Sequence, residues 1–493
     1  MQDHLGELTK HTAEWRILED ILTLAYWDSE VTMPPGGMER RSELLGYLSE
    51  KLATLHSADE IGVHLAALET EDQSKLSRTQ QGLIRDARDV YDRARKIPPA
   101  LEGELMTLAT HTTVAWRAAR ARNEFSKFAP FLEQVLTIVR KKAELVNPAQ
   151  DPYEVLLQSY DPSLTIELVD RLFAELRAGL EPLLAKIKAS NVKVSERTFL
   201  ETVPLETQQT FNKAIAHTLG LNEVKSRVDV STHPMSFWMG DARITTRYGK
   251  DWWDPLGSTA HEAGHSLYEQ NIDRTLPGCV ANSSSLVIHE AQSRFMENHV
   301  FQSNAFTKYL APRIAEAYNV RITADELYQT INQVKPSFIR VEADEVTYPF
   351  HVFLRYDIEK RLVRGELAVV DLPKAWNEGM HELLGVTPRT DTQGCLQDVH
   401  WCDGGFGYFP TYVLGSMFAA QIEFSMRRNV KVFDELLEVG DLERVNKWLA
   451  ERIHKEGRTY SASDIVRRAT GEPLQAKFLV DYLNHKYSDL YKL

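Results

Sequence analysis

The segment SELLGYLSEKLATLHSADEIGVHLAALE, residues 42–69, repeats its apolar side chains at spacings of three and four. This period is typical of an α-helix with one buried face and one solvated face. Residues 75–146 continue the pattern, and only Pro98-Pro99 interrupts it. Another helix is expected after Asp161, where capping residues precede TIELVDRLFAELRAGLEPLLAKIKA. The sequence therefore predicts a mainly α fold with a large helical body.

Residues 224–250, VKSRVDVSTHPMSFWMGDARITTRYGK, differ from the rest because their apolar residues alternate more than they repeat at helical spacing. The segment is rich in β-branched and aromatic residues and contains a turn candidate at Met239-Gly240-Asp241. We expect a small hairpin or a three-stranded sheet here. Strands and helices do not alternate along the chain, so a parallel sheet is not expected.

The composition is that of a soluble globular protein, with 43% apolar and 26% charged residues. A chain of 493 residues without a visible linker suggests one large body or two closely joined ones, and we predict a single catalytic domain over residues 1–493. The net charge of −13 argues against a nucleic-acid partner, whose phosphates need clustered Lys and Arg.

The chain shows no signal for a membrane or an oxidising compartment. Residues 1–30 lack the uninterrupted apolar core of a signal peptide, and no stretch reaches 18 uncharged apolar residues. Three cysteines, an odd number in a large chain, fit free thiols in a reducing compartment. We therefore expect no membrane partner and a cytoplasmic location.

The motif HEAGH at residues 261–265 is the strongest functional signal. Asp254 and Pro255 are expected to begin its helix, as a capping carboxylate followed by proline at the first helical position. Histidines four residues apart project from one helix face, about 5–6 Å apart at Cβ. Two imidazoles so placed can share one Zn²⁺ at about 2.0–2.1 Å each. Glu262 is angled to reach a water on that metal.

Two histidines are too few, because a catalytic zinc takes three protein ligands and keeps one position for water. The metzincin arrangement, with a third histidine six residues after His265, is absent because residue 271 is Asn. A glutamate from a second helix is then the natural third ligand. The helical segment SSSLVIHEAQSRFMENHV, residues 283–300, offers four candidates that spacing alone does not separate: His289, Glu290, Glu297 and His299.

These residues resemble the carboxypeptidase Taq family of metallocarboxypeptidases. Besides HExxH, four further motifs in the family's order carry the resemblance: Asp241-Ala-Arg243-Ile-Thr245 for DxRxT, His289-Glu290-Ala291-Gln292 for HES/GQ, Ile339-Arg340-Val-Glu-Ala343-Asp344 for IRxxAD, and Gly394-Cys-Leu-Gln397-Asp398-Val-His400-Trp401 for GxxQDxHW. The likeness reaches both ends of the chain. Ala291 departs from the family's usual Ser or Gly, and we expect this difference to affect packing or a contact behind the ligands, but not a ligand itself.

The resemblance implies a helical fold with a long deep active-site cleft, similar to the helical oligopeptidases, and a homodimer. It makes His261, His265 and Glu290 the ligands of one Zn²⁺ per chain, and it makes Glu262 the catalytic carboxylate. A His₂Glu set also accepts Co²⁺ or Mn²⁺. The implied activity is the release of single C-terminal residues, with broad specificity, from peptides with a free C-terminus, by zinc-activated water.

Stabilising the oxyanion and binding the substrate's terminal carboxylate both need hydrogen-bond donors in addition to the metal. His400, with Tyr408 or Tyr412, is the best local source of hydrogen bonds for a tetrahedral oxyanion. A free α-carboxylate suits arginine, whose planar fork binds both oxygens. Among the arginines near the matched motifs we choose Arg340. The alternative for Arg340 is an ion pair within one helix with Asp344, four residues on.

Four more residues are expected around the substrate. Arg243 is predicted to brace the site together with Asp241. His233, ahead of the expected hairpin, is a candidate substrate contact. Gln397 and its neighbour Asp398 are expected to orient the imidazole of their motif or to line the cleft.

Two other functions fit part of the pattern. An endo-acting zinc oligopeptidase on the same scaffold would use the metal and Glu262 in the same way, but it would not need Arg340 to anchor a carboxylate. A catalytically silent helical scaffold could bind zinc for structure alone. Glu262 argues against the scaffold, because structural zinc sites fill all four positions with protein ligands and need no adjacent base.

Overall fold

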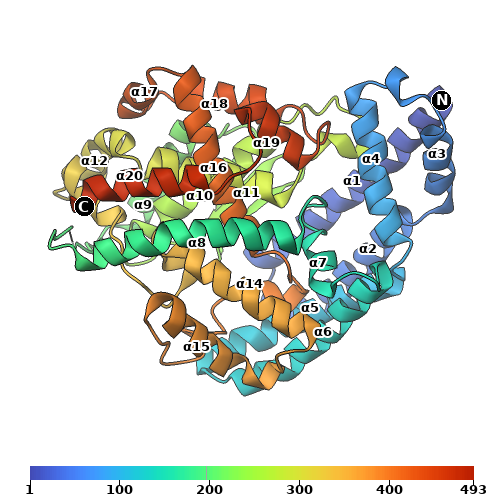
Figure 1. Ribbon diagram of the computed structural model, residues 1–493, viewed down its shortest axis with the longest axis horizontal. Helices are drawn as coiled ribbons and strands as arrows, with labels where there is room; N and C mark the ends of the chain where they lie inside the picture. Colours follow the sequence, from blue (N-terminus) through green and yellow to red (C-terminus); the bar gives the residue numbers. More distant parts are fainter. Residues whose placement is uncertain (196, 232) are drawn as a thin grey trace. The chain divides into compact units, whose positions relative to one another are not determined.

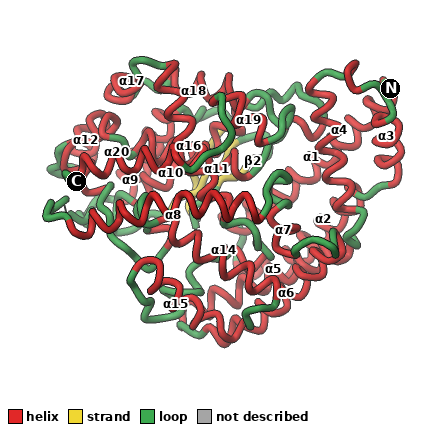
Figure 2. The backbone as a smooth tube through the Cα atoms, in the orientation of Figure 1, coloured by secondary structure: helices red, strands yellow, loops and turns green. Residues whose placement is uncertain are grey.

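The computed structural model describes residues 1–195, 197–231 and 233–493, and most of these residues are helical (Figure 1). Figure 2 shows strands only in one small patch, the three-stranded sheet between residues 226 and 246. The predicted mainly α fold with a small sheet is confirmed. Contacts along the chain divide it into two compact units: residues 1–171, 275–280 and 335–413, and residues 172–274, 281–334 and 414–493.

The first unit is built from helices of the N-terminal third and two later ones. They are α1 (Gln2–Val31), α2 (Met38–His56), α3 (Asp59–Glu69), α4 (Arg78–Ala94), α5 (Pro99–Arg122), α6 (Phe125–Val146), α7 (Pro152–Leu157), α14 (Tyr348–Arg364) and α15 (Leu372–Leu384). The predicted helical stretch 42–69 forms α2 and α3, and the predicted break at Pro98-Pro99 separates α4 from α5, which begins at Pro99.

Apolar side chains at helical spacing form the core of this unit. Residues 61, 65 and 68 on α3 are fully buried and pack with residues 5, 8 and 15 on α1. Glycine brings α2 and α5 close together, because a β-carbon at Gly46 would lie 2.5 Å from Oγ1 of Thr107. The periodic pattern therefore marks the buried faces correctly, as expected for helices with one apolar stripe.

The second unit contains the sheet and most of the later helices. Its helices are α9 (Leu205–Leu219), α10 (Asp254–Asn271), α11 (Leu286–Arg294), the π-helix η4 (Phe295–Phe301), α12 (Asn304–Tyr318), α13 (Ala324–Ile331), α17 (Phe433–Val439), α18 (Glu443–Leu449), α19 (Ala462–Thr470) and α20 (Lys477–Tyr491). Two helices begin in the first unit and continue into the second: α8 (Ile166–Ala189) and α16 (Pro410–Asn429).

The sheet is a hairpin with a third strand added in parallel. Its order is β1 (Ser226–Val230), β3 (Ala242–Thr246), β2 (Ser236–Trp238). β2 pairs antiparallel with β3, and Gly240 supplies the positive φ of 95° in their turn, at the predicted Met-Gly-Asp position. β1 pairs parallel with β3. The sheet is therefore mixed and not a parallel sheet, and its one parallel pair is connected by a short crossover through β2 instead of the usual helix.

The sheet lies against α10, and both belong to one hydrophobic core. Thr246 Oγ1 lies 2.7 Å from the hydroxyl of Ser258 on α10, and Ser236 Oγ lies 3.1 Å from that of Ser266. Large buried aromatic rings fill the core of this unit: Trp252, Tyr268, Phe295, Phe301 and Phe306. The described helices include none that is both long and apolar enough to cross a membrane.

The predicted starts of two helices can be compared with the structure. α8 begins at Ile166, where the hydroxyl of Thr165 accepts a hydrogen bond from the nitrogen of Leu168 at 3.1 Å. α10 begins at Asp254, one residue earlier than predicted, and Asp254 makes no cap. The capping role predicted for Asp254 is wrong, because its carboxylate pairs with Arg247 at 2.8 Å instead.

Two predictions on organisation stay open. The single catalytic domain predicted over residues 1–493 concerns function, and division into two compact units does not decide it. The deep cleft that the family resemblance implies also stays a prediction.

Candidate active site

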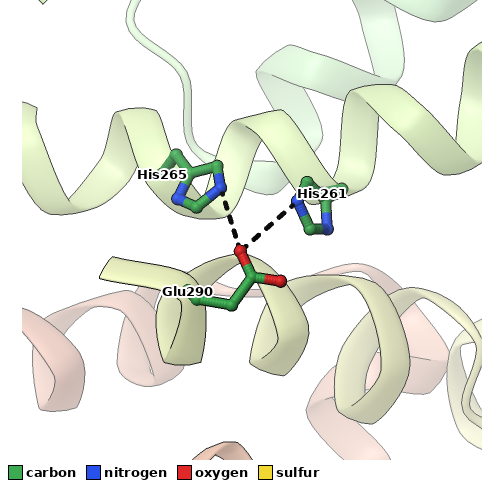
Figure 3. A group of neighbouring side chains, drawn as sticks. All are labelled: His261, His265 and Glu290. Carbon is green, nitrogen blue, oxygen red and sulfur yellow. Dashed lines mark ion pairs between the residues drawn. The ribbon is translucent and has the colours of Figure 1, made fainter. Parts of the chain in front are cut away.

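Two helices of the second unit bring three metal-binding side chains together (Figure 3). His261 and His265 project from one face of α10, and Glu290 projects toward them from α11. Glu290 Oε2 lies 3.4 Å from Nε2 of His265 and 3.7 Å from Nε2 of His261. The ligand atoms lie within 4.8 Å of one another, and no other such group of three occurs among the residues that the structure describes.

This donor set fits zinc. Ligands at about 2.0–2.1 Å from a tetrahedral ion lie about 3.3–3.4 Å from one another. The two carboxylate–imidazole distances, 3.4 and 3.7 Å, are close to that value. Two imidazoles and one carboxylate are also the protein ligands of catalytic zinc sites that leave one position for water. Co²⁺ and Mn²⁺ accept the same donors.

Two glycines allow the helices to come close enough for this cluster. A β-carbon at Gly264, between the two histidines, would lie 2.3 Å from the carbonyl oxygen of Gln292 on α11. A β-carbon at Gly415 on α16 would lie 2.7 Å from the side chain of Glu290. Neither glycine has a positive φ. Both are therefore required by packing against α11 and not by backbone conformation.

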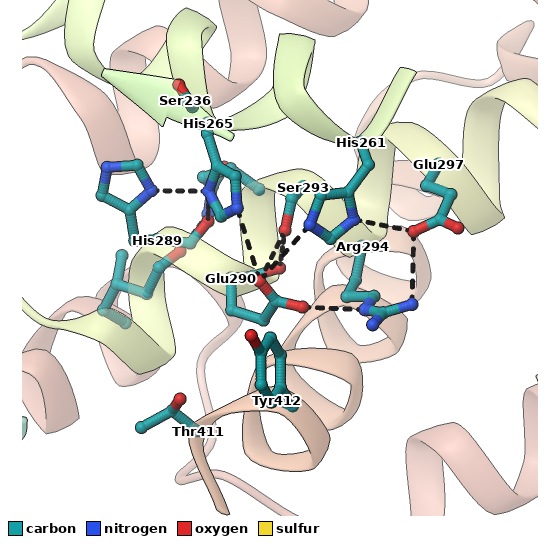
Figure 4. Close-up of polar contacts among 12 residues, drawn as sticks. Ser236, His261, His265, His289, Glu290, Ser293, Arg294, Glu297, Thr411 and Tyr412 are labelled. Atoms are coloured by element: carbon teal, nitrogen blue, oxygen red, sulfur yellow. Dashed lines mark hydrogen bonds and ion pairs between the residues drawn. The ribbon is translucent and has the colours of Figure 1, made fainter. Parts of the chain in front are cut away.

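The carboxylate of Glu297 contacts Nδ1 of His261, the ring nitrogen that faces away from Glu290 (Figure 4). His261 Nδ1 lies 2.8 Å from Oε2 of Glu297, which leaves Nε2 for a metal. Glu297 lies in the π-helix η4, which follows α11 directly after Arg294. Arg294 donates from Nε to Glu290 Oε1 at 2.8 Å and from Nη1 to Glu297 Oε2 at 3.2 Å.

A second chain of contacts supports His265. Its Nδ1 lies 3.1 Å from the carbonyl oxygen of His289 and 2.6 Å from the Nδ1 of the same residue. On its other side, His289 Nε2 lies 3.0 Å from Oε1 of Glu269, which also pairs with Arg274 at 3.1 Å. Both histidine ligands are thus oriented by a neighbouring acceptor, which fixes the tautomer that a metal needs.

The electrostatics of the cluster favour a bound cation. Burial opposes ionisation of Glu290, but His261 and Arg294 outweigh it and hold the pKa of this carboxyl well below its ordinary value. Burial lowers the pKa of His265 to about 4, so its ring is neutral at pH 7 and can offer a lone pair. Burial also opposes protonation of His261, yet the carboxylates of Glu290 and Glu297 raise its pKa. A metal cation can replace that proton.

Glu262 is suited to transfer a proton. It follows His261 on α10 and is 6% exposed. Burial raises the pKa of the Glu262 carboxyl to about 7, with a smaller contribution from the neighbouring carboxylates of Glu290 and Glu297. A carboxyl group that titrates near neutral pH can accept a proton and return it in the same cycle.

The first unit buries a different charge cluster, centred on Asp398. Arg340 donates to this carboxylate from Nη2 at 2.9 Å and from Nε at 3.3 Å. Arg355 on α14 donates to it from Nε at 2.8 Å. Arg340 is 3% exposed and Arg355 is fully buried. Two guanidinium groups therefore share one carboxylate in a sheltered position.

Asp344 does not pair with Arg340, so the predicted alternative for this arginine is wrong. The Asp344 carboxylate accepts hydrogen bonds from the backbone nitrogens of Val346 and Thr347 and from the hydroxyl of Thr347. Arg340 lies in a 3₁₀ turn, η5 (Arg340–Glu342), and the backbone at residue 343 is extended. Without an α-helix, a spacing of four residues does not bring two side chains together.

Gln397 ties the two arginines together. Its Oε1 accepts from the backbone nitrogen of Arg340 at 2.7 Å and from Nη2 of Arg355 at 2.6 Å. Its Nε2 donates to the carbonyl oxygens of Phe338, Gln393 and Gly394. These contacts favour a positioning role for Gln397 over the predicted substrate contact, which stays a prediction.

Three predicted residues with ring side chains gather beside Arg340. His400 Nε2 lies 2.9 Å from the hydroxyl of Tyr412. The ring of Tyr408 is 5.3 Å from that of His400 and 5.2 Å from that of Tyr412, between centroids. The guanidinium carbon of Arg340 lies 4.6 Å from the centre of the Tyr412 ring. The first unit thus brings these four predicted residues into contact.

The remaining predicted residues lie near the sheet of the second unit. Arg243 on β3 donates from Nε to Asp241 Oδ2 at 2.9 Å, which confirms the predicted pair. His233 precedes β2, and its Nδ1 lies 2.7 Å from the carbonyl oxygen of the following proline. The roles of Arg243 and His233 toward a substrate stay predictions.

Sequence analysis missed the residues that surround the ligands. Arg294 follows Glu290 by four residues, a spacing that pairs side chains on a helix, and this signal could have identified it. Glu297 is predicted only as a possible ligand and not as the partner of His261. Glu269 lies on α10 and reaches the imidazole of a residue on α11, so no spacing along the chain reveals that contact.

Comparison with known proteins gives one consistent result over the full chain. The family model described as Carboxypeptidase Taq (M32) metallopeptidase matches residues 7–487. Carboxypeptidase 1 of Bacillus subtilis is 38% identical over 481 residues, which cover 96% of each chain. Thermostable carboxypeptidase 1 of Pyrococcus furiosus is 35% identical over 504 residues, which cover 97% of each chain.

Solved structures agree in fold as well as in sequence. The crystal structure of BsuCP has a TM-score of 0.95 at 36% identity and covers 99% of each chain. The structure of Pyrococcus furiosus carboxypeptidase has a TM-score of 0.92 at 32% identity, again over 99% of each chain. Metallocarboxypeptidase 1 of Trypanosoma cruzi has a TM-score of 0.91 at 31% identity, with 99% of this chain and 100% of that chain covered.

Proposed function

The chain belongs to the carboxypeptidase Taq (M32) family of metallopeptidases and is a metallocarboxypeptidase; on this premise we propose that its metal is zinc, held by His261, His265 and Glu290. We propose that it removes single residues, with broad specificity, from the free C-terminus of peptides. The observation that carries the proposal is the cluster of three metal-binding side chains beside a buried carboxyl group, Glu262.

The division of labour follows from the residues around the metal. A bound zinc ion would lower the pKa of a water molecule toward 7 and polarise the scissile carbonyl. Glu262 takes a proton from the attacking water and returns it to the leaving amine, as a general base and then a general acid. Burial, which raises the pKa of its carboxyl, favours the return of the proton.

Arg340 is proposed as the anchor for the substrate's terminal carboxylate. It belongs to a cluster in which two arginines share Asp398, so one positive charge is left without a partner in that cluster. The natural complement of this charge is an anion, and a guanidinium group binds a carboxylate through two parallel hydrogen bonds. Such an anchor would restrict cleavage to the C-terminus.

His400 and Tyr412 are proposed to supply a hydrogen bond to the oxyanion of the transition state: the Nε2–H of His400 donates to the Tyr412 hydroxyl, and that hydroxyl donates to the oxyanion. Their contact of 2.9 Å lets one ring orient the other before substrate binds. Tyr408, which packs on both, is proposed to line the substrate site together with Arg243 and His233, and Gln397 is proposed to position Arg340 there. Removing one such donor typically costs about 10²–10³-fold in kcat.

A timed digest of one unstructured peptide tests the proposed activity. Mass spectrometry should show a ladder that loses one residue at a time from the free C-terminus. Amidation of the C-terminus and addition of a chelator should each abolish the ladder. Internal fragments that survive amidation would indicate an endo-acting oligopeptidase. Absence of any cleavage, with zinc confirmed bound, would favour the silent scaffold.

The metal and the assembly need separate measurements. Elemental analysis of the purified protein should find one zinc per chain, and Co²⁺ or Mn²⁺ should restore activity after chelation. We also propose a cytoplasmic homodimer, because the family resemblance implies the dimer. Light scattering after gel filtration should then give about twice the chain mass of 56.3 kDa, and the mass of one chain would rule the dimer out.

A further inference from the structure

We propose that Arg294 is a positioning residue that fixes two of the three metal ligands at once. Its guanidinium holds Glu290 directly and holds His261 through Glu297. The inference rests on the metal site proposed above and deepens it. It predicts that metal binding depends on an arginine that does not itself touch the metal.

The direct contact selects the oxygen that Glu290 presents to the metal. Arg294 Nε donates a hydrogen bond to Oε1 of Glu290 at 2.8 Å. The other oxygen, Oε2, is the one that faces the imidazole ligands, and it also accepts a hydrogen bond from the hydroxyl of Ser293 at 3.0 Å. A carboxylate held in this way offers one oxygen in a defined direction. Without Arg294 it could rotate between two orientations.

The indirect contact acts on the tautomer of His261. Oε2 of Glu297 accepts from Arg294 Nη1 at 3.2 Å and lies 2.8 Å from His261 Nδ1. Glu297 therefore keeps the proton of the imidazole on Nδ1 and the lone pair on Nε2, where the metal binds. Arg294 is 12% exposed and Glu297 is 19% exposed, so water competes little for these contacts.

The backbone explains how one arginine serves two carboxylates. Residues 290 and 294 are four apart at the end of α11, and residue 297 follows in the π-helix η4. The π-helical turn keeps Glu297 on the side that faces α10, as Figure 4 shows for Glu290, Arg294 and Glu297. π-Helical segments are rare, and those inserted in α-helices are frequently found at functional sites.

Simple electrostatics predicts the opposite effect, which makes the proposal testable. Arg294 is a cation close to the proposed site of a divalent cation, so its repulsion should weaken metal binding. Removing the charge would then strengthen binding. If Arg294 acts mainly by positioning Glu290 and His261, removing it should weaken binding instead. The direction of the change separates the two roles.

The same unit contains a matched control. His299 Nδ1 lies 2.8 Å from Oε2 of Glu423, and Arg427 Nε donates to Oε1 of Glu423 at 2.8 Å. This triad repeats the His–Glu–Arg arrangement at a place where no group of three metal-binding side chains occurs in the described chain. Arg427 is more exposed than Arg294, at 42%, and it also pairs with Asp434. Loss of Arg427 should therefore cost little stability, and it should not affect a metal.

The experiment measures the Zn²⁺ dissociation constant of full-length apo-protein by competition with a chromogenic chelator. Arg294→Met should weaken binding about 10–100-fold, as expected for a residue that orients ligands. Arg294→Lys keeps the charge but lacks the planar fork, so it should weaken binding by about tenfold. Arg427→Met should leave the dissociation constant within about twofold of wild type, because Arg427 and its partner Glu423 contact none of the proposed metal ligands.

Each result decides the matter. Unchanged or tighter zinc binding by Arg294→Met with native helix content, seen by circular dichroism, would overturn the proposal. If Arg294→Met does not fold, Arg294→Lys decides, and wild-type affinity in that variant would overturn it. Equal weakening by Arg427→Met would show a general loss of stability and would also refute positioning. A wild-type protein that binds no zinc would instead refute the proposed metal site itself.

Discussion

The metal cluster of the second unit and the arginine cluster of the first unit use the same kinds of contact but carry opposite charge. Beside the metal ligands, two carboxylates, Glu290 and Glu297, share one cation, Arg294. In the other cluster, two guanidinium groups share one anion, Asp398. Counted over these residues alone, and without the His261 proton that a bound metal would replace, the first cluster carries one negative charge and the second one positive charge.

Buried net charge is costly unless a partner of opposite sign arrives. One cluster therefore lacks a cation and the other lacks an anion. These are the two kinds of ligand that a metallocarboxypeptidase must bind: a divalent metal and the carboxylate at the end of a peptide. The comparison teaches that the sign of an incomplete charge network predicts the class of ligand that completes it.

The largest expected effect is at Glu262, the proton-transfer group of the metal cluster. Glu262→Gln should lower kcat/KM by about 10²–10⁴-fold, because the amide cannot accept a proton from water. Elemental analysis should still find zinc, since Glu262 is not a proposed ligand. A variant that loses activity together with its metal would show that Glu262 belongs to the charge network rather than to the chemistry.

Removal of the metal should destabilise the metal cluster and leave the arginine cluster nearly unchanged. A ligand present at a thousandfold excess over its Kd stabilises the folded state by about 4 kcal/mol. Chelation should therefore lower the melting temperature and increase hydrogen exchange in α10 and α11. Exchange in α14, which carries Arg355, should change much less, and an equal increase in α14 would contradict a local effect.

The arginine cluster is tested by Arg340→Lys. The variant keeps the charge but loses the planar fork, so kcat/KM on peptides with a free C-terminus should fall by about 10–100-fold, the value of one or two charged hydrogen bonds. Arg361→Lys on α14, a half-exposed arginine, is the control and should be neutral. Equal activity of Arg340→Lys and wild type would remove Arg340 as the anchor.

Helix packing at the metal cluster gives a smaller, structural prediction. Gly264→Ala should cost about 1–3 kcal/mol in the free energy of unfolding and weaken zinc binding, because its β-carbon would press on the backbone of α11. Gly257→Ala on the same helix is the matched control, with its nearest neighbour atom at 3.7 Å. It should stabilise the protein by about 0.5–1 kcal/mol. Denaturant titration measures both.

The pH dependence of stability tests the charge balance around Asp398. Burial opposes ionisation of Asp398, but Arg340 and Arg355 outweigh it and hold its pKa well below the ordinary value. A lowered native-state pKa stabilises the fold above the unfolded pKa of about 3.9, and this contribution is lost as pH falls through the native value.

Asp398→Asn should remove this contribution. Between pH 4 and the acid transition, the free energy of unfolding of wild type should therefore fall more steeply than that of the variant, by up to about 1.4 kcal/mol per pH unit. Urea titrations of both proteins at a series of pH values measure the difference. Parallel curves would show that Asp398 is not held ionised by its arginines.

Local sequence signals predicted the parts of the site that lie within one helix. The spacing of four between His261 and His265 is enough to place both imidazoles on one face, whatever the rest of the fold does. The same rule failed for Arg340 and Asp344, because residues 340–344 do not form an α-helix. A spacing rule holds only where the backbone has the period that the rule assumes.

Contacts between elements could not be predicted from the chain alone. Spacing left four candidates for the third position, and only the family resemblance pointed to Glu290. The structure supplies the physical reason, because the crossing of α10 and α11 brings Glu290, rather than Glu297, against both imidazole Nε2 atoms. That crossing depends on Gly264, whose role is invisible until a neighbouring backbone is in place. Likewise, Asp398 is recognised as the partner of two arginines only after folding.

By itself, the sequence determined the helical class, the short strand-rich segment before the metal helix, the two histidine ligands with their adjacent carboxyl group, and a family resemblance that the comparisons confirm. These depend on period and composition, which are local. Tertiary structure alone decided which side chains form ion pairs with one another and which nitrogen or oxygen atom each ligand presents to the metal. Those depend on distances between distant segments, and packing sets such distances to within a fraction of an ångström.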